Sequence, residues 1–460
     1  MSSYVTLNPT TGKTEQEFAQ LDDAAVTRVL SRSDAEFARW RATPASERAR
    51  LLIRVADAYD ARREELAKLI STEMGKPMQE AVGEVELAAA IYRWYGEHGP
   101  DLLEREVLDP QGSEESLVQT GPIGSLIGVM PWNYPYYQVA RFVAPNLMVG
   151  NTIILKHAAI CAASSEVMAE IVHTAGVRED AYINVFASND QVADMIADHR
   201  VRGVSLTGSE RAGASVAETA GRHLKKAVLE LGGSDPLIVL DDGDIERTAT
   251  IAAQARLSNT GQACNSPKRM IVDNGKIDDF VSIITDAFES AKVGDPTDPG
   301  TQVGPLSSIT ARDTVVEQVR RAVEQGATLH TGGAAVEGDG AFMRPAVLTG
   351  VTKGMDAYSE EIFGPVAVIH GVDSSDEAVA LANDVGFGLS GSVWGSDIER
   401  AQEIADRLEV GMAYINEHGT TLPGLPFGGV KRSGFGRELG RWGMGEFVNT
   451  RLRRTSTTKK

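Results

Sequence analysis

Short apolar segments alternate with helix-like segments from residue 125 to residue 233, and this alternation constrains the fold more than any other feature. The apolar segments are SLIGVM, NTIILK, AYINVF, GVSLTG and AVLELGG. The segments at 162–176 and 210–221, which lie between them, have the composition of helices. Strand–helix alternation predicts a parallel sheet covered by helices on both faces. Ligands of such sheets bind at the carboxyl ends of the strands, so functional residues are expected there.

The rest of the chain predicts further elements and more than one domain. Residues 43–70 and 81–99 place apolar side chains at helical spacing, so two helices are expected, the second ending near Gly99. A loop rich in proline and glycine lies at 293–305, and a second alternating region follows it, with an apolar segment around 365–372. A chain of 460 residues can form two or more domains. We therefore expect an α/β protein with several domains.

Composition argues against several classes of function. The formal net charge of −19 disfavours binding to nucleic acid or to an anionic membrane, because both need clustered positive charge. Two cysteines cannot form a disulfide framework, and neither a signal peptide nor a membrane-spanning apolar run is visible, so we expect a cytoplasmic protein. The sequence has no HExxH motif and no cluster of Cys and His at metal spacing, so no metal site is predicted.

One of the two cysteines, Cys264, lies in the polar, flexible stretch NTGQACNSPKR. A structural cysteine more often lies in an apolar periodic segment, as Cys161 does beside a predicted helix. A turn can expose a thiol and direct backbone N–H groups at it, which lowers the thiol pKa and makes the sulfur nucleophilic. Cys264 is therefore a candidate nucleophile, and a buried small hydrophobic side chain is the alternative.

Glu230 interrupts the apolar strand of AVLELGGSDP. A carboxyl group among the neighbouring leucines and valine should have a raised pKa, which suits a general base near neutral pH. The alternative is a carboxylate at the end of a strand that accepts a hydrogen bond from a backbone N–H. Glu230 is therefore a candidate base.

Two further loops follow predicted strands and begin predicted helices. In MPWNYP, Asn133 lies between Pro131 and Pro135, where its amide could donate into a cleft or cap the helix. In LTGSERAG, Gly208 and Ser209 place backbone N–H groups and a hydroxyl at a helix N-terminus. Such an N-terminus is a natural seat for a phosphate group.

Together, these segments resemble the aldehyde dehydrogenase superfamily. The motifs that carry the resemblance occur in the family's order, and they are MPWNYP, ILKHA, LTGSERAG, LELGG, GQAC, EEIFGPV and LPFGGVKRSGFGRE. NPTTGK at 8–13 and VGDPTDPGTQVGPL at 293–306 extend the resemblance over nearly the whole chain. Within the superfamily, residues 135–158 are most similar to the short-chain succinate-semialdehyde dehydrogenases.

The resemblance implies a fold of three parts. A Rossmann-like cofactor-binding domain is expected from 1–101 and 123–232, and a catalytic domain from 233–443. A small β oligomerisation arm is expected from 102–122 and 444–460, so a homodimer or homotetramer is predicted.

The resemblance also implies a mechanism. Cys264 attacks the aldehyde carbon, and the Asn133 side chain and the Cys264 backbone N–H stabilise the oxyanion. The thiohemiacetal then gives up hydride and becomes a thioester, and Glu230 activates the water that hydrolyses it to a carboxylic acid. A dehydrogenase that transfers the acyl group to coenzyme A would not need Glu230, so Glu230 argues against that rival.

The resemblance further implies which residues hold the cofactor. They are Lys156 at the adenosine ribose, Gly208 and Ser209 at the pyrophosphate, Trp132 beside it, Glu361 at the nicotinamide ribose, Phe363 nearby, and Gly232, which leaves room for the nicotinamide. Many NAD-selective members carry Glu three residues after the lysine, and this chain has Ala159 there. A carboxylate would repel a 2′-phosphate, so its absence permits NADP, which we expect to be preferred over NAD. Lys156 and His157 could help to hold the phosphate.

The substrate is expected to be succinate semialdehyde, oxidised to succinate. Tyr137 and Arg141 lie one helical turn apart, so they share a face, and the guanidinium could bind the distal carboxylate of a semialdehyde. The alternative for Arg141 is an ion pair with a nearby acid. Asn265, Ser266 and the loop at 416–429 depart from the family pattern. They leave an aromatic or other aliphatic aldehyde as the alternative substrate.

Overall fold

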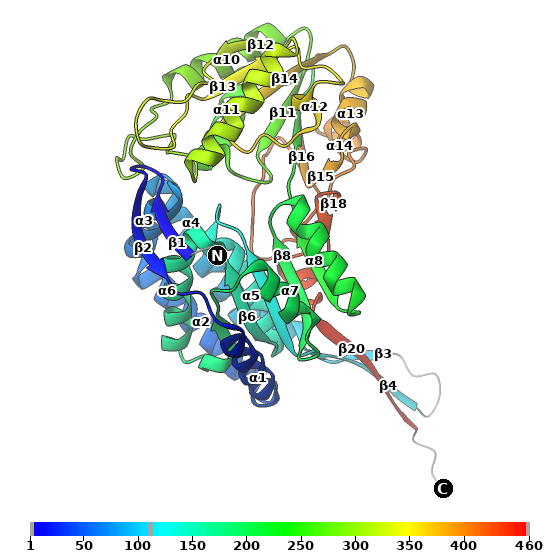
Figure 1. Cartoon of the computed structure of the whole chain (residues 1–460). Coiled ribbons are helices and arrows are strands. Elements are labelled where there is room, and N and C mark those ends of the chain that lie inside the picture. The colour runs from blue at the N-terminus through cyan, green and yellow to red at the C-terminus, as the bar shows by residue number, and fades with distance from the viewer. Residues whose placement is uncertain (1–3, 109–113, 457–460) are drawn as a thin grey trace.

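The computed structural model describes residues 4–108 and 114–456, and two open sheets organise them (Figure 1). The first sheet has six strands in the order β19-β9-β8-β5-β6-β7. Its strands are β5 (Ser125–Met130), β6 (Thr152–His157), β7 (Tyr182–Asn184), β8 (Val201–Thr207), β9 (Lys226–Glu230) and β19 (Gly434–Phe435). Every neighbouring pair is parallel except β19 with β9. The predicted α/β class is confirmed.

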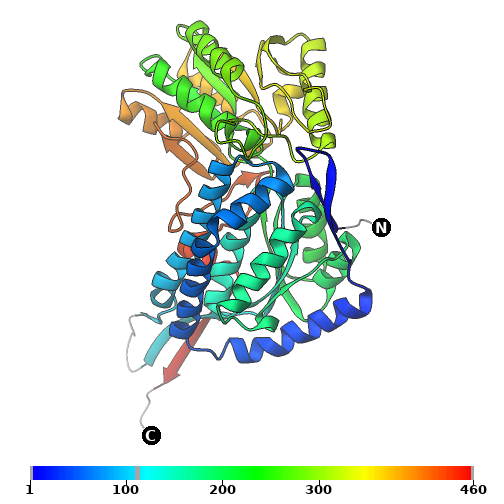
Figure 2. The same cartoon turned by 90° about the vertical axis from the view of Figure 1, so that its left-hand side faces the viewer.

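Helices cover both faces of this sheet (Figure 2). They are α1 (Asp23–Trp40), α2 (Ala45–Ala61), α3 (Arg63–Met74), α4 (Met78–Leu102), α5 (Pro135–Val149), α6 (Ala162–Thr174), α7 (Asn189–Ala197) and α8 (Glu210–Arg222). The single helix predicted at 43–70 is two helices, because the backbone leaves helical geometry at Arg62 (φ −109°, ψ 16°). Helix α4 continues beyond Gly99, since that glycine makes room for the Met148 side chain of α5 and does not end the helix.

The second sheet has seven strands in the order β12-β13-β14-β11-β10-β16-β17. Its strands are β10 (Asp235–Val239), β11 (Pro267–Asp273), β12 (Thr328–Thr331), β13 (Ala346–Thr349), β14 (Val366–Val372), β16 (Ser390–Trp394) and β17 (Met412–Ile415). Its helices are α9 (Ile245–Leu257), α10 (Ile277–Ser290), α11 (Ile309–Glu324), α12 (Asp356–Ser359), α13 (Ser375–Asn383) and α14 (Ile398–Ala405). Only β12 is antiparallel to its neighbour.

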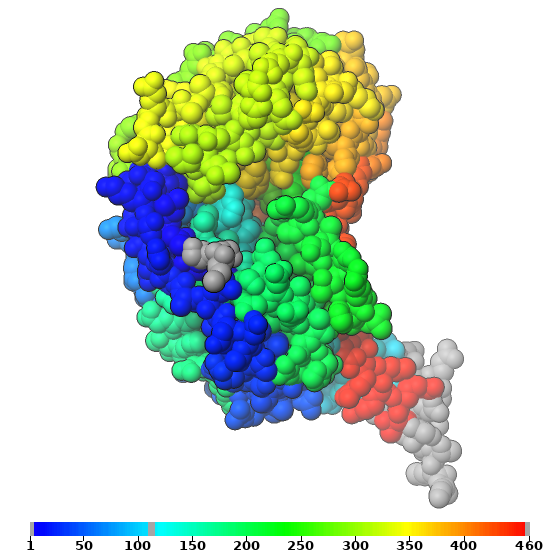
Figure 3. All heavy atoms as spheres, in the orientation of Figure 1, coloured from blue at the N-terminus to red at the C-terminus, as the bar shows by residue number. Residues whose placement is uncertain are grey.

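A three-stranded antiparallel sheet projects from the body of the molecule (Figure 1). It contains β3 (Glu106–Leu108), β4 (Glu114–Pro122) and β20 (Val448–Ser456), which fall in the segments predicted to form the arm. On the side of the molecule where the two sheet regions meet, the hairpin of β1 (Tyr4–Asn8) and β2 (Lys13–Phe18) reaches the part of the chain built around the second sheet (Figure 3). There Ala341 donates a backbone hydrogen bond to the Pro9 carbonyl at 2.8 Å.

The sheets follow the predicted division into domains with one difference. Strand β19 lies within the predicted catalytic segment, yet it pairs with β9 of the first sheet. The chain also forms a short antiparallel pair, β15 (Phe387–Gly388) with β18 (Val430–Lys431). Helix α15 (Gly440–Met444) follows β19. The domain boundaries stay a prediction, and their portions at 1–3, 109–113 and 457–460 lie outside the described residues.

The strand register brings the predicted motifs to one edge of the first sheet. Val129 of β5 pairs with Lys156 of β6 and with Leu206 of β8, and Thr207 pairs with Glu230 of β9. The carboxyl ends of these strands therefore meet, and the loops after them face the second sheet. Within the ranges given above, no helix is both long and apolar enough to cross a membrane.

Candidate active site

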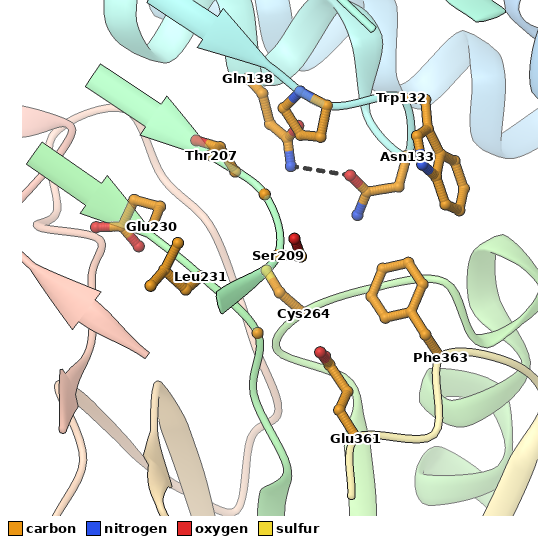
Figure 4. Close-up of a pocket in the computed structure, with 13 residues that line it drawn as sticks. Trp132, Asn133, Gln138, Thr207, Ser209, Glu230, Leu231, Cys264, Glu361 and Phe363 are labelled. Carbon is orange, nitrogen blue, oxygen red and sulfur yellow. Dashed lines mark hydrogen bonds between the residues drawn. The ribbon is translucent and has the colours of Figure 1, made fainter. Parts of the chain in front are cut away.

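A cavity of about 260 Å³ lies where the first sheet faces the second (Figure 4). Its lining includes all three predicted catalytic residues and most of the predicted cofactor residues. The lining residues are Pro131, Trp132, Asn133, Gln138, Thr207, Gly208, Ser209, Glu230, Leu231, Gly232, Cys264, Glu361 and Phe363. Lys156, Tyr137 and Arg141, which were also predicted, do not line it.

Cys264 lies three residues after a short 3-10 turn, η3 (Ser258–Gly261), whose backbone is unusual. Asn259 and Thr260 have φ of 50° and 55°, a left-handed conformation that is costly for a β-branched residue such as threonine. Gly261 also has a positive φ, of 72°, and a Cβ there would collide with the backbone of Gly364. The turn that delivers the sulfur to the cavity is therefore fixed by the surrounding backbone.

The electrostatic setting of the Cys264 thiol differs from the expected one. Burial raises the pKa of the thiol to about 12, and the cations Arg141 and Lys268 oppose that shift. We expected the turn to lower this pKa, and that expectation was wrong because the side chain lies in a cavity wall and not in open solvent. The position of the thiol nevertheless matches the nucleophile interpretation, since it shares the cavity with Asn133 and Glu230.

The Asn133 side chain is buried and held by a network of hydrogen bonds. Its amide nitrogen donates to the Gln262 carbonyl at 3.0 Å, and its oxygen accepts from the Gln138 side chain at 3.2 Å (Figure 4). Lys76 and Asn259 each donate to the Asn133 backbone carbonyl at 2.9 Å. The helix-cap alternative does not describe these contacts, because α5 begins without a side-chain cap.

Glu230 is the last residue of β9, and only 2% of its surface is exposed. Among the described residues, neither carboxylate oxygen has a hydrogen-bond partner, so the backbone-bonded alternative does not apply. Burial raises the pKa of Glu230 well above its usual value, as expected, and the nearby Arg141 opposes this shift. One oxygen lies against Gly428, where a Cβ would approach it to 2.6 Å.

Arg141 has the acidic partner that its alternative interpretation requires. Its guanidinium is only 1% exposed and forms an ion pair with Glu438. It also donates to the Tyr137 hydroxyl at 3.1 Å and to the Thr207 hydroxyl at 3.3 Å, and it stacks 4.3 Å from the ring centroid of Phe427. Neither Arg141 nor Tyr137 therefore presents a free group to the cavity, and their substrate-binding role stays a prediction.

Glu361 and Phe363 enter the cavity from the loop before β14. Glu361 accepts a hydrogen bond from the Gly233 backbone at 3.1 Å and pairs with Lys268 at 3.3 Å. The Phe363 ring lies 5.8 Å from the Trp132 ring in an edge-on contact. A Cβ at Gly232 would overlap the Glu361 carboxylate, so this glycine makes room for Glu361 itself.

A buried arginine that the sequence analysis missed connects two loops of the site. One is the nucleophile loop, which carries Cys264 between η3 and β11, and the other carries Glu361 between α12 and β14. Arg256 is fully buried, and it donates to the carbonyls of Gly261 and Ile362 at 3.0 and 2.8 Å. Burial lowers the pKa of its guanidinium to about 9. Its sequence signal is weak, because one arginine on an apolar helix face is usually a surface residue whose stem is buried.

A second cavity, of about 410 Å³, lies between α7 and α8. Val129 and Leu206 line it together with residues of α7 and α8, including Arg211. Lys156 lies on the neighbouring strand in register with Val129. His157 is buried, its ring nitrogen lies 3.2 Å from the Pro135 carbonyl, and burial lowers its pKa to about 4, so it is not placed to hold a phosphate.

The fold and the site define an α/β protein with a cysteine-containing cavity at the edge of a Rossmann-like sheet. A sulfur, an amide donor and a buried carboxylate share one cavity, and a helix N-terminus capped by Ser209 opens onto it. The chain belongs to the aldehyde dehydrogenase family, whose model matches residues 2–452.

Similar proteins support this assignment over almost the full chain. A Deinococcus radiodurans protein named succinate-semialdehyde dehydrogenase [NADP(+)] is 51% identical over 458 residues, which are 99% of this chain and 96% of that protein. An Escherichia coli protein named succinate semialdehyde dehydrogenase [NAD(P)+] Sad is 40% identical, over 97% of this chain and 96% of its own. The crystal structure of succinic semialdehyde dehydrogenase from Streptococcus pyogenes in complex with NADP+ has a TM-score of 0.96 and 42% identity, and the match covers 98% of this chain and 99% of that one.

Proposed function

We propose that this protein oxidises succinate semialdehyde to succinate through a thioester on Cys264, with NADP as the preferred cofactor and NAD as the second. The observation that carries the proposal is the convergence of Cys264, Asn133 and Glu230 on one cavity. The names of the similar proteins from D. radiodurans and S. pyogenes support the substrate and the cofactor.

In the first step the Cys264 thiol gives up its proton to solvent water, and the thiolate sulfur then bonds to the aldehyde carbon while the π electron pair of the C=O bond moves onto oxygen. The carbonyl oxygen then carries negative charge and needs preorganised donors. One proton of the Asn133 amide is donated to Gln262, which leaves the other for the oxyanion. The backbone N–H of Cys264 donates to no acceptor within 4–108 and 114–456, so it is the second donor.

The last step is hydrolysis of the thioester, and it needs a base that water can reach. Glu230 lines the same cavity as Cys264, and its unpaired oxygens can accept a proton from water. The raised pKa that burial gives Glu230 suits this role, because a carboxylate with a higher pKa is a stronger base. Because its carboxylate rests against Gly428, the side chain has to rotate toward the thioester.

The residues present fit a dinucleotide. The first cavity reaches Ser209 and the second is lined by Arg211 and Ala212, so both border the start of α8, where Ser209 and the helix N-terminus suit a pyrophosphate. Lys156 is half-buried and forms no salt bridge within residues 4–108 and 114–456, and Ala159 itself carries no carboxylate, which suits a 2′-phosphate. Glu361 would bind the nicotinamide ribose, with Phe363 and Trp132 beside it. When bound, the cofactor supplies the hydride acceptor.

An aromatic or other aliphatic aldehyde is the second candidate substrate, and two observations favour it. The guanidinium of Arg141 is occupied by Glu438, so it is not free to read a distal carboxylate. A further cavity of about 200 Å³ lies under the loop at 416–429, and its lining is mainly apolar, with Met412, Leu422, Leu425 and Phe427.

The assembly and the location are also proposals. Leu452 of β20 and Val107 of β3 expose 58% and 65% of their surface on the projecting arm, which suits a subunit interface in a homodimer or homotetramer. The lack of a cysteine framework suits the cytoplasm. Light scattering coupled to size exclusion tests the assembly, and a monomer would contradict it.

A kcat/KM panel with both cofactors tests the proposed function. Succinate semialdehyde with NADP should give the highest value, and Cys264→Ala should abolish oxidation while NADP still binds. A higher value for benzaldehyde or hexanal would favour the second candidate. Turnover above background in Cys264→Ala would contradict the cysteine mechanism altogether.

A further inference from the structure

Lys268 lies directly behind the nucleophile loop, and the mechanism above does not use it. It is the second residue of β11 and only 2% exposed. Its ammonium group donates to the carbonyls of Ala263 and Cys264 at 2.8 and 2.7 Å, and it lies 3.3 Å from a Glu361 oxygen. An ammonium group has three protons, and these three acceptors match them.

One of these acceptors belongs to the peptide unit that carries an oxyanion donor. The carbonyl of Ala263 and the N–H of Cys264 are the two ends of one planar peptide group. A cation bonded to the carbonyl oxygen polarises that peptide, and in a buried site such polarisation strengthens the hydrogen bond given by the N–H. It also restrains the rotation of the peptide plane, which fixes the direction in which the N–H points.

We propose that Lys268 is a positioning residue that polarises the Ala263–Cys264 peptide and so strengthens the N–H donor to the oxyanion. The proposal rests on the proposed function, because it concerns the step in which sulfur bonds to the carbonyl carbon. In that step the π electron pair of the C=O bond moves onto oxygen, and no group leaves. The negative charge therefore grows where the Cys264 N–H can meet it.

Two acids near Lys268 favour its charged form against the larger effect of burial. Burial lowers the pKa of its ammonium group, but Glu361 and the buried Asp235 oppose that shift. The charged groups that bear on the Cys264 thiol are Arg141 and Lys268, which lower its pKa, and Asp235 and Glu361, which raise it. Lys268 thus acts on the sulfur as well as on the peptide, and a test has to separate the two effects.

Two reactions of Cys264 separate them in the protein without cofactor. Acylation by p-nitrophenyl acetate develops an oxyanion, whereas alkylation by iodoacetamide depends on the thiolate but forms no oxyanion. In Lys268→Met we expect acylation to fall at least tenfold further than alkylation, when both are compared across their pH profiles. Equal losses in the two reactions, or no loss in either, would overturn the proposal.

Two further variants test whether a loss in Lys268→Met comes only from a change in structure. Lys276 also donates to a backbone carbonyl, that of Gly243 at 2.7 Å, but far from the cavity, so Lys276→Met should leave both reactions unchanged. Lys268→Gln keeps an uncharged N–H donor and should fall between the wild type and Lys268→Met in acylation. If Lys268→Met does not fold, the ratio of the acylation rate to the alkylation rate is compared between the wild type and Lys268→Gln. A ratio that is the same in both proteins overturns the proposal.

The same experiment distinguishes failure of this proposal from failure of the proposed function. If the wild type is not acylated at Cys264, or does not oxidise aldehydes, the cysteine mechanism fails whatever Lys268 does. If the wild type is acylated at Cys264 and Lys268→Met matches it in both reactions, only the role of Lys268 fails. The affinity for NADP, measured by titration, should change less than threefold, because Glu361 keeps its bond from Gly233.

Discussion

The Asn133 side chain donates a hydrogen bond to the backbone carbonyl of Gln262 at 3.0 Å, two residues before the nucleophile. This bond joins the loop after β5 of the first sheet to the loop that carries Cys264, which leads into β11 of the second sheet. Asn259 donates to the same carbonyl at 3.1 Å, so the cysteine loop has a second support. The Asn133 amide and the loop that carries the Cys264 sulfur are therefore positioned by one network.

Asn133→Ala should impair catalysis more than folding. The variant loses one oxyanion donor, a change that typically lowers kcat by about 100- to 1000-fold. Because Asn259 still holds the Gln262 carbonyl, the midpoint of thermal unfolding should fall only slightly. Stopped-flow measurement of hydride transfer checks the first expectation and calorimetry checks the second. A kcat within threefold of the wild type would contradict the donor role.

Glu230→Gln should separate the two halves of the reaction. The amide cannot take a proton from water, so the thioester should form and then persist. We expect a burst of reduced cofactor, close to one equivalent per site, followed by very slow turnover. The burst is read from the absorbance of the reduced nicotinamide, and mass spectrometry should find the acylated protein. Steady-state turnover equal to the wild type would count against the base role.

Arg141→Met should destabilise the protein and should not select against charged substrates. Removing the guanidinium leaves Glu438 buried without its partner, which typically costs about 3–5 kcal/mol in the free energy of unfolding. The double variant with Glu438→Gln should recover part of that loss in urea denaturation. The kcat/KM values for succinate semialdehyde and butanal should fall by similar factors. A loss confined to succinate semialdehyde would restore the carboxylate-binding role.

Ala159→Glu should reduce the preference for NADP. The new carboxylate would lie three residues after Lys156, where it should repel a 2′-phosphate and accept a bond from a 2′-hydroxyl. We expect the ratio of kcat/KM for NADP to that for NAD to fall about tenfold or more, equivalent to about 1.4 kcal/mol. The value for NAD in the same variant is the internal control, and an unchanged ratio would place the phosphate elsewhere.

Glu73 should give the stability of the protein a pH dependence that Glu73→Gln removes. Burial raises its pKa from 4.5 to about 7, although Ser164, Thr6 and the Ala163 backbone N–H donate to the carboxylate and oppose the shift. Between these values the folded protein keeps a proton that the unfolded chain has lost. The stability contributed below pH 4.5 is therefore lost as the pH rises to 7, by about 3 kcal/mol. Urea denaturation across this range checks the slope, with the exposed Glu64→Gln as control. An unchanged slope in Glu73→Gln would contradict the assignment.

Much of the fold, and the meeting of the candidate catalytic residues in one cavity, could be predicted, because both depend on local sequence. Apolar runs of strand length predicted the parallel strands. Residues that follow those strands, such as Asn133 and Ser209, lie at one edge because the carboxyl ends of parallel strands meet there. Glu230 interrupts such a run and is buried at its end, so its raised pKa also followed from its neighbours. The motif resemblance supplied the roles that these positions alone left open.

What could not be predicted depends on contacts between distant segments. Arg141 pairs with Glu438, and no local pattern links two residues so far apart in the chain. The raised thiol pKa of Cys264 arises from packing around a turn that looks exposed in the sequence. The sequence did contain a signal for Lys268, which was missed. Two cations, Lys268 and Arg269, stand near the start of an apolar strand, and both need partners when the strand is buried.

The pairing of Gly434 with Glu230 has a consequence for biosynthesis. The strand that ends in Glu230 gains its outer neighbour only after residue 435 has left the ribosome, long after Glu230 itself has been synthesised. Before then, a nascent chain can fold much of both sheets, but it cannot enclose the Glu230 carboxylate. Catalytic competence should therefore appear abruptly once β19 has paired, so a ribosome stalled before β19 should carry a largely structured but inactive chain.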